Sequence, residues 1–414
     1  MERKIYPLDG YRVLDFGTAW AGPQVGLILA DMGAEVIKVE TKTRPDGARL
    51  GRPMTGEDIA GGDKGKWLDM QPIFHGINRN KLSFTIDLKT PKGRDIIYQL
   101  VKISDVALDN SSPGAMERLG LDHKSLEQIR PDIISISLTG CGETGPLKDT
   151  LVYAPLIISL GGLQNMIGYY GEDTPMGVMF AYGDANASIH AAFSTLAALW
   201  HREMTGEGQH IELSESGVVT CLLGEAVMDY SMNGRVTKPI GNRHPHMCPH
   251  NAYRCQGDDK WVTIAVKTEK EWENFCKTIG EPHWTRDAKF ADLNGRIAHQ
   301  EELDKLITTW TINNSPDEVT DILQQAGVAA MPVMDIADQF SHPFYQERQT
   351  YLEIEHPLVG VELLYANPMR LSQTPGDIRR PAPSIGEHNQ YVLGELLGMS
   401  DEQITRLTQE KVIY

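Results

Sequence analysis

The sequence predicts an α/β protein with a doubly wound, Rossmann-like large domain and a smaller α+β domain. Over about the first 200 residues, short apolar runs typical of buried strands alternate with segments of helical periodicity. Glycine and proline stand where these helices would begin and end. After a loop at 234–250 that contains three prolines, strands and helices follow in a different order, which indicates a second domain.

The elements of the large domain are expected from their apolar patterns and flanking residues. The first helix would begin at Pro23 and end before Gly33, between two strands. The expected strands lie at 12–16, 35–39, 83–87, 106–108, 133–138 and 209–213, and the expected helices at 23–32, 93–102, 126–130 and 189–200. Because parallel strands end at one edge of a sheet, we expect a crevice there that suits an anionic ligand.

The remaining elements set the expected domain boundaries. After an apolar helix at 218–230, we expect strands at 252–255 and 261–266, helices at 269–279 and 301–309, and a helix that begins with a capping box at 315–318. A strand at 328–334 would return the chain to the large domain, followed by a hairpin of 351–355 with 361–365 and a last helix begun by Ser400. The expected boundaries are 1–215 and 331–414 for the large domain, 216–250 for a linker helix and loop, and 251–330 for the small domain.

Composition excludes several classes of partner and site. The formal charge of −17 disfavours nucleic acid and anionic membranes, because both attract a basic surface. The five cysteines are odd in number and scattered, so neither a disulfide framework nor a zinc ribbon is indicated. The first residues lead into no apolar run, so no export signal is expected, and nowhere do 18 apolar residues follow one another. We therefore expect a cytoplasmic protein.

Asp184 is the candidate catalytic residue. It stands in Gly183-Asp184-Ala185-Asn186, directly before the apolar-periodic run at 189–200, so its carboxylate would lie where a helix begins. The positive end of the helix dipole would keep this carboxylate ionised, as a nucleophile must be. The same position also suits a structural helix cap, and local sequence leaves both interpretations open.

Other motifs give weaker indications. The loop at 140–145 has the glycine spacing of a dinucleotide site, but Pro146 follows and no helix opens there, so close approach of backbone to a ligand is favoured. Asn110 and Ser111 follow a strand and Arg118 lies close behind, which is a reasonable phosphate-binding arrangement. In the loop at 244–250 histidines and a cysteine recur at every second residue, but two prolines disfavour a metal site, and we expect Arg243 and His244 to bind a substrate carboxylate.

Together these segments resemble the class III CoA-transferase family, typified by formyl-CoA transferase and carnitine CoA-transferase. The similar segments include Ala21-Gly22-Pro23, Gly183-Asp184 and Gly386-Glu387-His388. The others lie at 8–15, 29–40, 78–81, 113–120 and 205–209, and all keep the family's order. The family's catalytic aspartate falls on Asp184, which favours the nucleophile over the cap.

The resemblance implies an interlocked dimer whose large domain binds CoA. It places CoA near a set of residues in the first-domain crevice: Trp20, Ala21, Lys89, Asn110, Ser111, Arg118 and Tyr153. It also implies that Asp184 attacks an acyl-CoA, becomes an aspartyl-CoA thioester and passes CoA to a free carboxylic acid. The CoA thioester is then a substrate, and neither a tightly bound cofactor nor a metal is expected.

The family's pattern is not kept everywhere, and two alternatives stay open. The glycine-run loop of formyl-CoA transferase is absent, and Trp20 stands where that enzyme has a glutamine, so a different acid is expected. An α-methylacyl-CoA racemase shares the fold, but Tyr153-Ala154 occupies the place of its proton-abstracting pair. A non-catalytic subunit of a heteromeric transferase is the second alternative. A homodimer is the expected assembly, with a heteromer left open.

Overall fold

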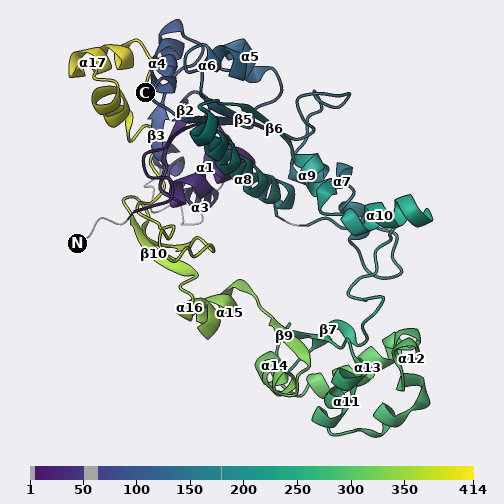
Figure 1. Cartoon of the computed structure of the whole chain (residues 1–414). Coiled ribbons are helices and arrows are strands. Elements are labelled where there is room, and N and C mark those ends of the chain that lie inside the picture. Colours follow the sequence, from purple (N-terminus) through teal and green to yellow (C-terminus); the bar gives the residue numbers. More distant parts are fainter. Residues whose placement is uncertain (1–4, 51–63, 179) are drawn as a thin grey trace. The chain divides into compact units, whose positions relative to one another are not determined.

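The chain forms two compact units, and the computed structural model describes residues 5–50, 64–178 and 180–414 (Figure 1). The first unit comprises Met1–Leu163, Gly177–Met228 and Glu347–Tyr414, and the second comprises Gln164–Met176 and Asp229–Gln346. Each unit therefore joins segments that lie far apart in the sequence. Within the described part of the chain, no helix has the length and apolar character needed to cross a bilayer.

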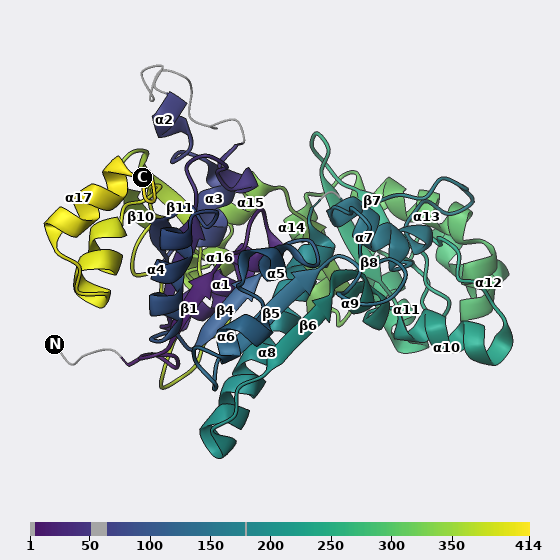
Figure 2. The ribbon, with the colours of Figure 1, turned by 90° about the horizontal axis from the view of Figure 1, so that it is seen from above.

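A six-stranded parallel sheet forms the centre of the first unit (Figure 2). Its strands are β1 (Arg12–Asp15), β2 (Glu35–Glu40), β3 (Leu82–Thr85), β4 (Val106–Asp109), β5 (Ile134–Thr139) and β6 (His210–Ser214). They are ordered β3-β2-β1-β4-β5-β6, and every neighbouring pair is parallel. The strand order reverses between β1 and β4, so the predicted doubly wound α/β fold is confirmed.

Alternate side chains of the strands fill two separate cores. Val13 lies in the core that contains α1 (Ala21–Asp31) and α8 (Tyr182–Thr205), whereas its neighbour Leu14 lies in the core that contains α4 (Pro91–Val101). This follows from the two-residue period of a strand, which points successive side chains to opposite faces. Helices α1 and α8 pack against each other on the first face (Figure 1).

The C-terminal segment completes the second of these cores. The backbone N–H of Asp87, just after β3, donates to the carbonyl of Val412 at 2.8 Å. Helix α17 (Asp401–Gln409) begins with the expected capping box of Ser400 and Gln403. The predicted hairpin is also present, as β10 (Tyr351–His356) and β11 (Gly360–Tyr365). The other helices of this unit are α2 (Lys64–Trp67), α3 (Pro72–Asn78), α5 (Ala115–Leu119), α6 (His123–Glu127), α7 (Ala154–Leu160) and α9 (Glu215–Cys221).

The second unit packs helices against a three-stranded antiparallel sheet. The strands are β7 (His250–Arg254), β8 (Trp261–Ala265) and β9 (Ala329–Val333). The helices are α11 (Glu269–Thr278), α12 (Leu293–Ala298), α13 (Gln300–Thr311), α14 (Pro316–Gln325) and α15 (Ile336–Ser341). The capping box predicted at Ser315 and Glu318 is confirmed at the start of α14. Tyr253, Phe275 and Leu303 belong to the buried core of this unit.

Two expectations about this half of the chain were wrong. The strand β9 does not return to the large domain, because it pairs with β8 and thereby keeps residues 331–346 in the second unit. The single helix expected at 218–230 is two helices, α9 and α10 (Gly224–Asn233), separated by Leu222 and Leu223. Helix α10 and the short α16 (Pro343–Glu347) cross the boundaries between the units.

Candidate active site

The loops that follow β1 and β4 are joined at the point where the strand order reverses. The side-chain oxygen of Asn110 accepts from the N–H of Thr18 at 2.8 Å, and its Nδ2 donates to the carbonyl of Thr18 at 2.9 Å. A β-carbon on Gly22 would lie 2.9 Å from Asn110 Oδ1, so only glycine fits there. These two loops therefore lie against each other at the carboxyl ends of β1 and β4, where the crevice is expected.

A buried serine connects this loop region to α8. The hydroxyl of Ser188 lies 2.8 Å from the carbonyl oxygen of Ala21 and 2.7 Å from that of Asp184. Ala21 begins α1, and Asp184 belongs to the first turn of α8. The contact fixes the starts of the two helices next to each other, as Figure 1 also shows for α1 and α8. It thereby places Asp184 near the loop after β1.

Asp184 does not cap its helix. Helix α8 begins at Tyr182, its N-cap residue is Ala181, and no side chain accepts a capping hydrogen bond there. Asp184 Oδ2 is buried and has no hydrogen-bond partner among the described residues. A buried carboxylate oxygen without a partner is costly, so such an atom needs an explanation. The structural alternative left open by the sequence is therefore not supported.

The environment of Asp184 also differs from the expected one. Burial raises the pKa of this carboxyl above its ordinary value, and the backbone N–H of Asp184 itself opposes this effect. The helix dipole alone would lower the pKa. Desolvation is the larger effect here, and it makes the carboxylate more basic than a solvated aspartate. A more basic carboxylate is a better nucleophile once it is ionised.

Glu215 is a buried carboxyl that the sequence reasoning missed. It is the first residue of α9, only 5% of it is exposed, and its Oε2 lacks a partner in the described ranges. Burial, followed by the charge of Asp184, raises its pKa to about 8. The only local signal was a glutamate after Ser214, which is typical of an ordinary helix start. Its burial depends on packing between α8 and α9, which no local pattern reveals.

A cavity of about 430 Å³ lies along β4 and the first half of β5. Ser111 and Gly114 line it, and the N–H of Ser111 donates to Asp109 at 2.8 Å. Burial raises the pKa of Asp109 to about 6, and this hydrogen bond opposes the shift. Arg118 is exposed on α5, and a β-carbon on Gly114 would lie 3.3 Å from its Nη1. The structure thus brings Ser111 and the start of α5 to one cavity.

The other expected CoA contacts are more dispersed. Trp20 is half-buried, donates from its indole N–H to Gln24 at 2.7 Å and packs against the small core around Phe74. Tyr153 precedes α7 and is exposed. Lys89 is exposed after β3, an edge strand that β2 and β1 separate from β4. Lys89 is therefore not brought next to Asn110 by the sheet.

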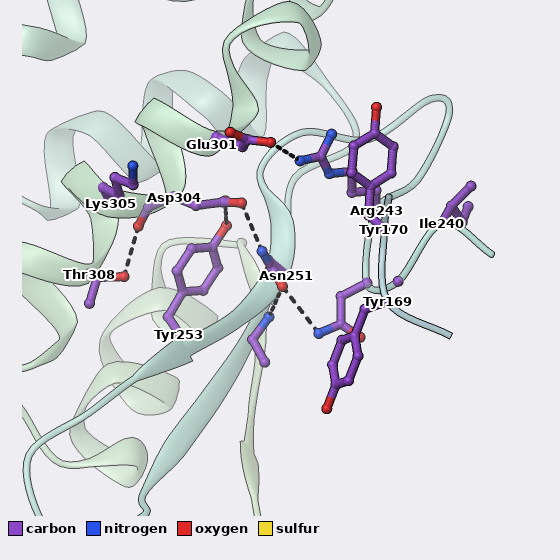
Figure 3. Close-up of a pocket in the computed structure, with 13 residues that line it drawn as sticks. Tyr169, Tyr170, Ile240, Arg243, Asn251, Tyr253, Glu301, Asp304, Lys305 and Thr308 are labelled. Carbon is purple, nitrogen blue, oxygen red and sulfur yellow. Dashed lines mark hydrogen bonds and ion pairs between the residues drawn. The ribbon is translucent and has the colours of Figure 1, made fainter. Parts of the chain in front are cut away.

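A second cavity, of about 600 Å³, lies within the second unit and includes Arg243 (Figure 3). The guanidinium carbon of Arg243 lies 3.4 Å from the centre of the Tyr170 ring, and its Nη2 is 3.0 Å from Glu301 Oε1. His244 was expected beside it, but His244 does not line this cavity. Its Nδ1 instead accepts from the N–H of His246 at 3.0 Å. Across the described residues, no group of three histidine, cysteine or acidic side chains is arranged to hold a metal ion.

Comparison with known proteins gives a consistent result along nearly the whole chain. The model of CoA-transferase family III matches residues 8–389. The chain is 32% identical to a succinyl-CoA–D-citramalate CoA-transferase of Chloroflexus aurantiacus, covering 100% of this chain and 99% of that protein. It is also 32% identical to the beta subunit of a succinyl-CoA–L-malate CoA-transferase from the same organism, covering 98% of each. A solved CAIB/BAIF family structure from Brucella suis has a TM-score of 0.84 at 29% identity, covering 95% of this chain and 100% of that chain.

Proposed function

Because this chain belongs to CoA-transferase family III, we propose that it moves CoA from an acyl-CoA to a free carboxylic acid through a covalent intermediate on Asp184. One observation carries the proposal: Asp184 Oδ2 is buried at the start of α8 without a partner in the described part of the chain. Structural carboxylates are normally satisfied, whereas a nucleophile keeps one oxygen available for its substrate.

The proposed chemistry is a double displacement. A carboxylate oxygen of Asp184 attacks the acyl carbon of the donor thioester, the C–S bond breaks, and CoA leaves as a thiolate. The thiolate then attacks the Asp184 carbonyl of the mixed anhydride, so that the donor acid leaves as a carboxylate and aspartyl-CoA remains. The acceptor carboxylate reverses these two steps and departs as a new acyl-CoA. One thioester replaces another, so the exchange consumes neither ATP nor any oxidant.

The loops at the carboxyl ends of β1 and β4 are the proposed CoA site. Ala21 is held by its hydrogen bond from Ser188, and Asn110 by its hydrogen bonds with Thr18. Ser111 lines the adjoining cavity. Helix N-termini and exposed basic side chains favour the CoA phosphates. In this proposal Arg118, Lys89, Trp20 and Tyr153 make the peripheral contacts.

Arg243 is the proposed contact of the acid, with His244 as a second candidate. Arg243 lines a cavity, and its guanidinium presents the planar fork that suits a carboxylate. The two relatives described above are named for succinyl-CoA and for citramalate or malate, which are short dicarboxylic acids. We therefore propose a short dicarboxylic acid as one substrate class, used by a cytoplasmic enzyme.

The racemase alternative is not favoured by the residues at the site. Tyr153 and Ala154 stand at the start of α7, and neither supplies the base that a racemase needs to remove the α-proton. Deuterium entering the α-carbon of a 2-methylacyl-CoA in the absence of an acceptor acid would support that alternative. A non-catalytic role would leave the buried Asp184 oxygen unexplained.

The decisive experiment compares the protein with its Asp184→Asn variant. Purified protein is incubated with a panel of acyl-CoAs and free acids, and mass spectrometry follows thioester exchange and a hydroxylamine-sensitive adduct on Asp184. We expect exchange and the adduct in the unmodified protein, and neither in the variant, because an amide is not a competent nucleophile. The matched control is Glu203→Gln, which neutralises a carboxyl near the end of the same helix. Full exchange by the Asp184→Asn variant would refute the assignment.

A further inference from the structure

Asp184 and Glu215 each hold a buried carboxyl oxygen without a hydrogen-bond partner in residues 5–50, 64–178 and 180–414. Glu215 is the more deeply buried of the two, with 5% of its surface exposed. An ionised carboxyl in that position would lose its hydration without compensation. Glu215 therefore has no evident structural role, and its closeness to the proposed nucleophile needs an explanation.

Helices α8 and α9 pack against each other, and the two carboxyls lie near enough for the charge of Asp184 to act on Glu215. A β-carbon on Gly183, which precedes Asp184, would lie 3.5 Å from Val219 Cγ2. Val219 is one helical turn after Glu215 on α9. Val219 thus lies at contact distance from the first turn of α8, and the first turns of α8 and α9 each carry one of the carboxyls.

The charge environment of Glu215 favours its neutral form at pH 7. Burial and then the Asp184 carboxylate raise the pKa of Glu215 to about 8. The other ionisable groups on the elements packed against α9 are Tyr153, Tyr182, His190, His201, Arg202, Glu203, His210 and Glu212. Of these, Arg202 pairs with Asp105, and the His210 ring contacts Glu143, so neither side chain offsets a negative charge on Glu215. A glutamate that loses its proton there would put a second negative charge beside Asp184.

We propose that neutral Glu215 is a positioning residue that offers its O–H to the Asp184 carboxyl during CoA transfer. This inference rests on the proposed function. When the CoA thiolate attacks the Asp184 carbonyl, a C–S bond forms and the carbonyl oxygen takes the electron pair. A neutral O–H donor stabilises that oxyanion without giving up its proton. As the C–O bond to the donor acid breaks, the carbonyl re-forms and the acid leaves with the charge.

The pH dependence of transfer tests this role. We expect the transfer rate of the unmodified protein to fall above about pH 8, where Glu215 ionises. Glu215→Gln keeps a neutral N–H donor, so it should retain most activity at pH 7 and lose the alkaline fall. Glu215→Leu keeps neutrality but not the donor, and should lower kcat about 100- to 1,000-fold with little change in KM. The exposed Glu207→Gln is the matched control and should keep the original profile.

A spectroscopic measurement separates this inference from the proposed function. Infrared difference spectra should contain a protonated carboxyl at pH 7 that disappears above about pH 8 and is absent from Glu215→Gln. Loss of exchange in Asp184→Asn bears only on the nucleophile. An alkaline fall that persists in Glu215→Gln, or the lack of that infrared band, would overturn the inference even if CoA transfer is established. If the glutamine variant does not fold, the spectrum of the unmodified protein still decides whether a neutral carboxyl titrates near pH 8.

Discussion

Lys81 and Asp15 form a fully buried ion pair directly beneath the proposed CoA-binding loops. Lys81 Nζ lies 2.7 Å from Asp15 Oδ2, and both side chains have no exposed surface. Lys81 also donates to the carbonyl of Pro23, and Asp15 Oδ1 accepts from the N–H of Gly17. Burial lowers the pKa of Lys81 to about 8, while Asp15 opposes that shift. The pair thus connects the end of β1, the following loop and the start of α1.

Replacing Lys81 should therefore destabilise the protein strongly. Lys81→Met leaves Asp15 buried without its cation, which costs about 3–5 kcal/mol in comparable buried pairs. Chemical unfolding at pH 7 measures the free energy of unfolding of each variant. The exposed pair of Lys92 and Glu410 supplies the control, and Lys92→Met should cost at most about 1 kcal/mol. Adding Asp15→Asn to Lys81→Met should recover part of the loss, whereas a cost for Lys81→Met no larger than the control would contradict this account.

The sheet was predictable because its strands carry short, nearly continuous apolar runs. Val13 and Leu14 point to opposite faces of the sheet, and both are buried. A strand that is buried on both faces is apolar at successive residues, so it can be recognised from the local sequence alone. The place of β9 was not predictable in the same way. Residues Ala329–Val333 pair with β8 rather than with the large sheet. Which strand has an unpaired edge is decided only when each unit has folded, so the local sequence does not reveal it.

The residues of the candidate site also fall into two groups: those that the local sequence marks and those whose role depends on packing between distant segments. Asp184 was found because glycine and a helical run mark it locally, and Asn110 because it follows a strand. Glu215 and Ser188 were missed because their roles depend on the approach of α8 to α9 and to α1. The helix dipole alone did not predict the direction of the Asp184 pKa shift. The pKa of a buried carboxyl also depends on how far the surrounding chain excludes water from it.

Substitutions at Arg243 test the proposed contact with the acid. Hydrogen bonds to charged groups contribute about 1.5–3 kcal/mol, so Arg243→Ala should raise KM for the acceptor acid by about 10- to 100-fold. KM for the acyl-CoA should change little. Arg243→Lys should recover only part of the affinity, because lysine lacks the planar fork that stacks on Tyr170. Steady-state kinetics with each substrate varied in turn measure both constants.

Two further variants sharpen that comparison. Glu301→Gln removes the carboxylate that pairs with Arg243 in the structure, so it should lower KM for the acid rather than raise it. Arg254 provides a matched control, since it also lies near an aromatic ring, Trp261, within the second unit. Arg254→Ala should leave the kinetics of both substrates unchanged. Equal effects of Arg243→Ala on the two KM values would instead indicate a general loss of structure.

Helix α8 leaves one apolar face exposed in the described chain, and we expect a second copy of the protein to cover it. Phe193 and Trp200 are 71% and 70% exposed on the same helix whose opposite face holds the buried Ala191 and Ala198. The whole exposed face comprises Ile189, Phe193, Leu196, Trp200 and Met204, which recur every three or four residues. A contiguous apolar face of this kind is typical of an interface.

Phe193→Glu combined with Trp200→Glu should therefore convert a dimer into a monomer, because two buried charges at the interface would be costly. Analytical ultracentrifugation measures the mass, and CoA transfer should be lost together with the dimer if the assembly shapes the site. Ile322→Glu, on α14 of the second unit, is the control and should remain dimeric. A dimer that survives the double substitution would rule out this face as the contact. A monomeric, inactive chain before any substitution would instead indicate that a different subunit covers α8.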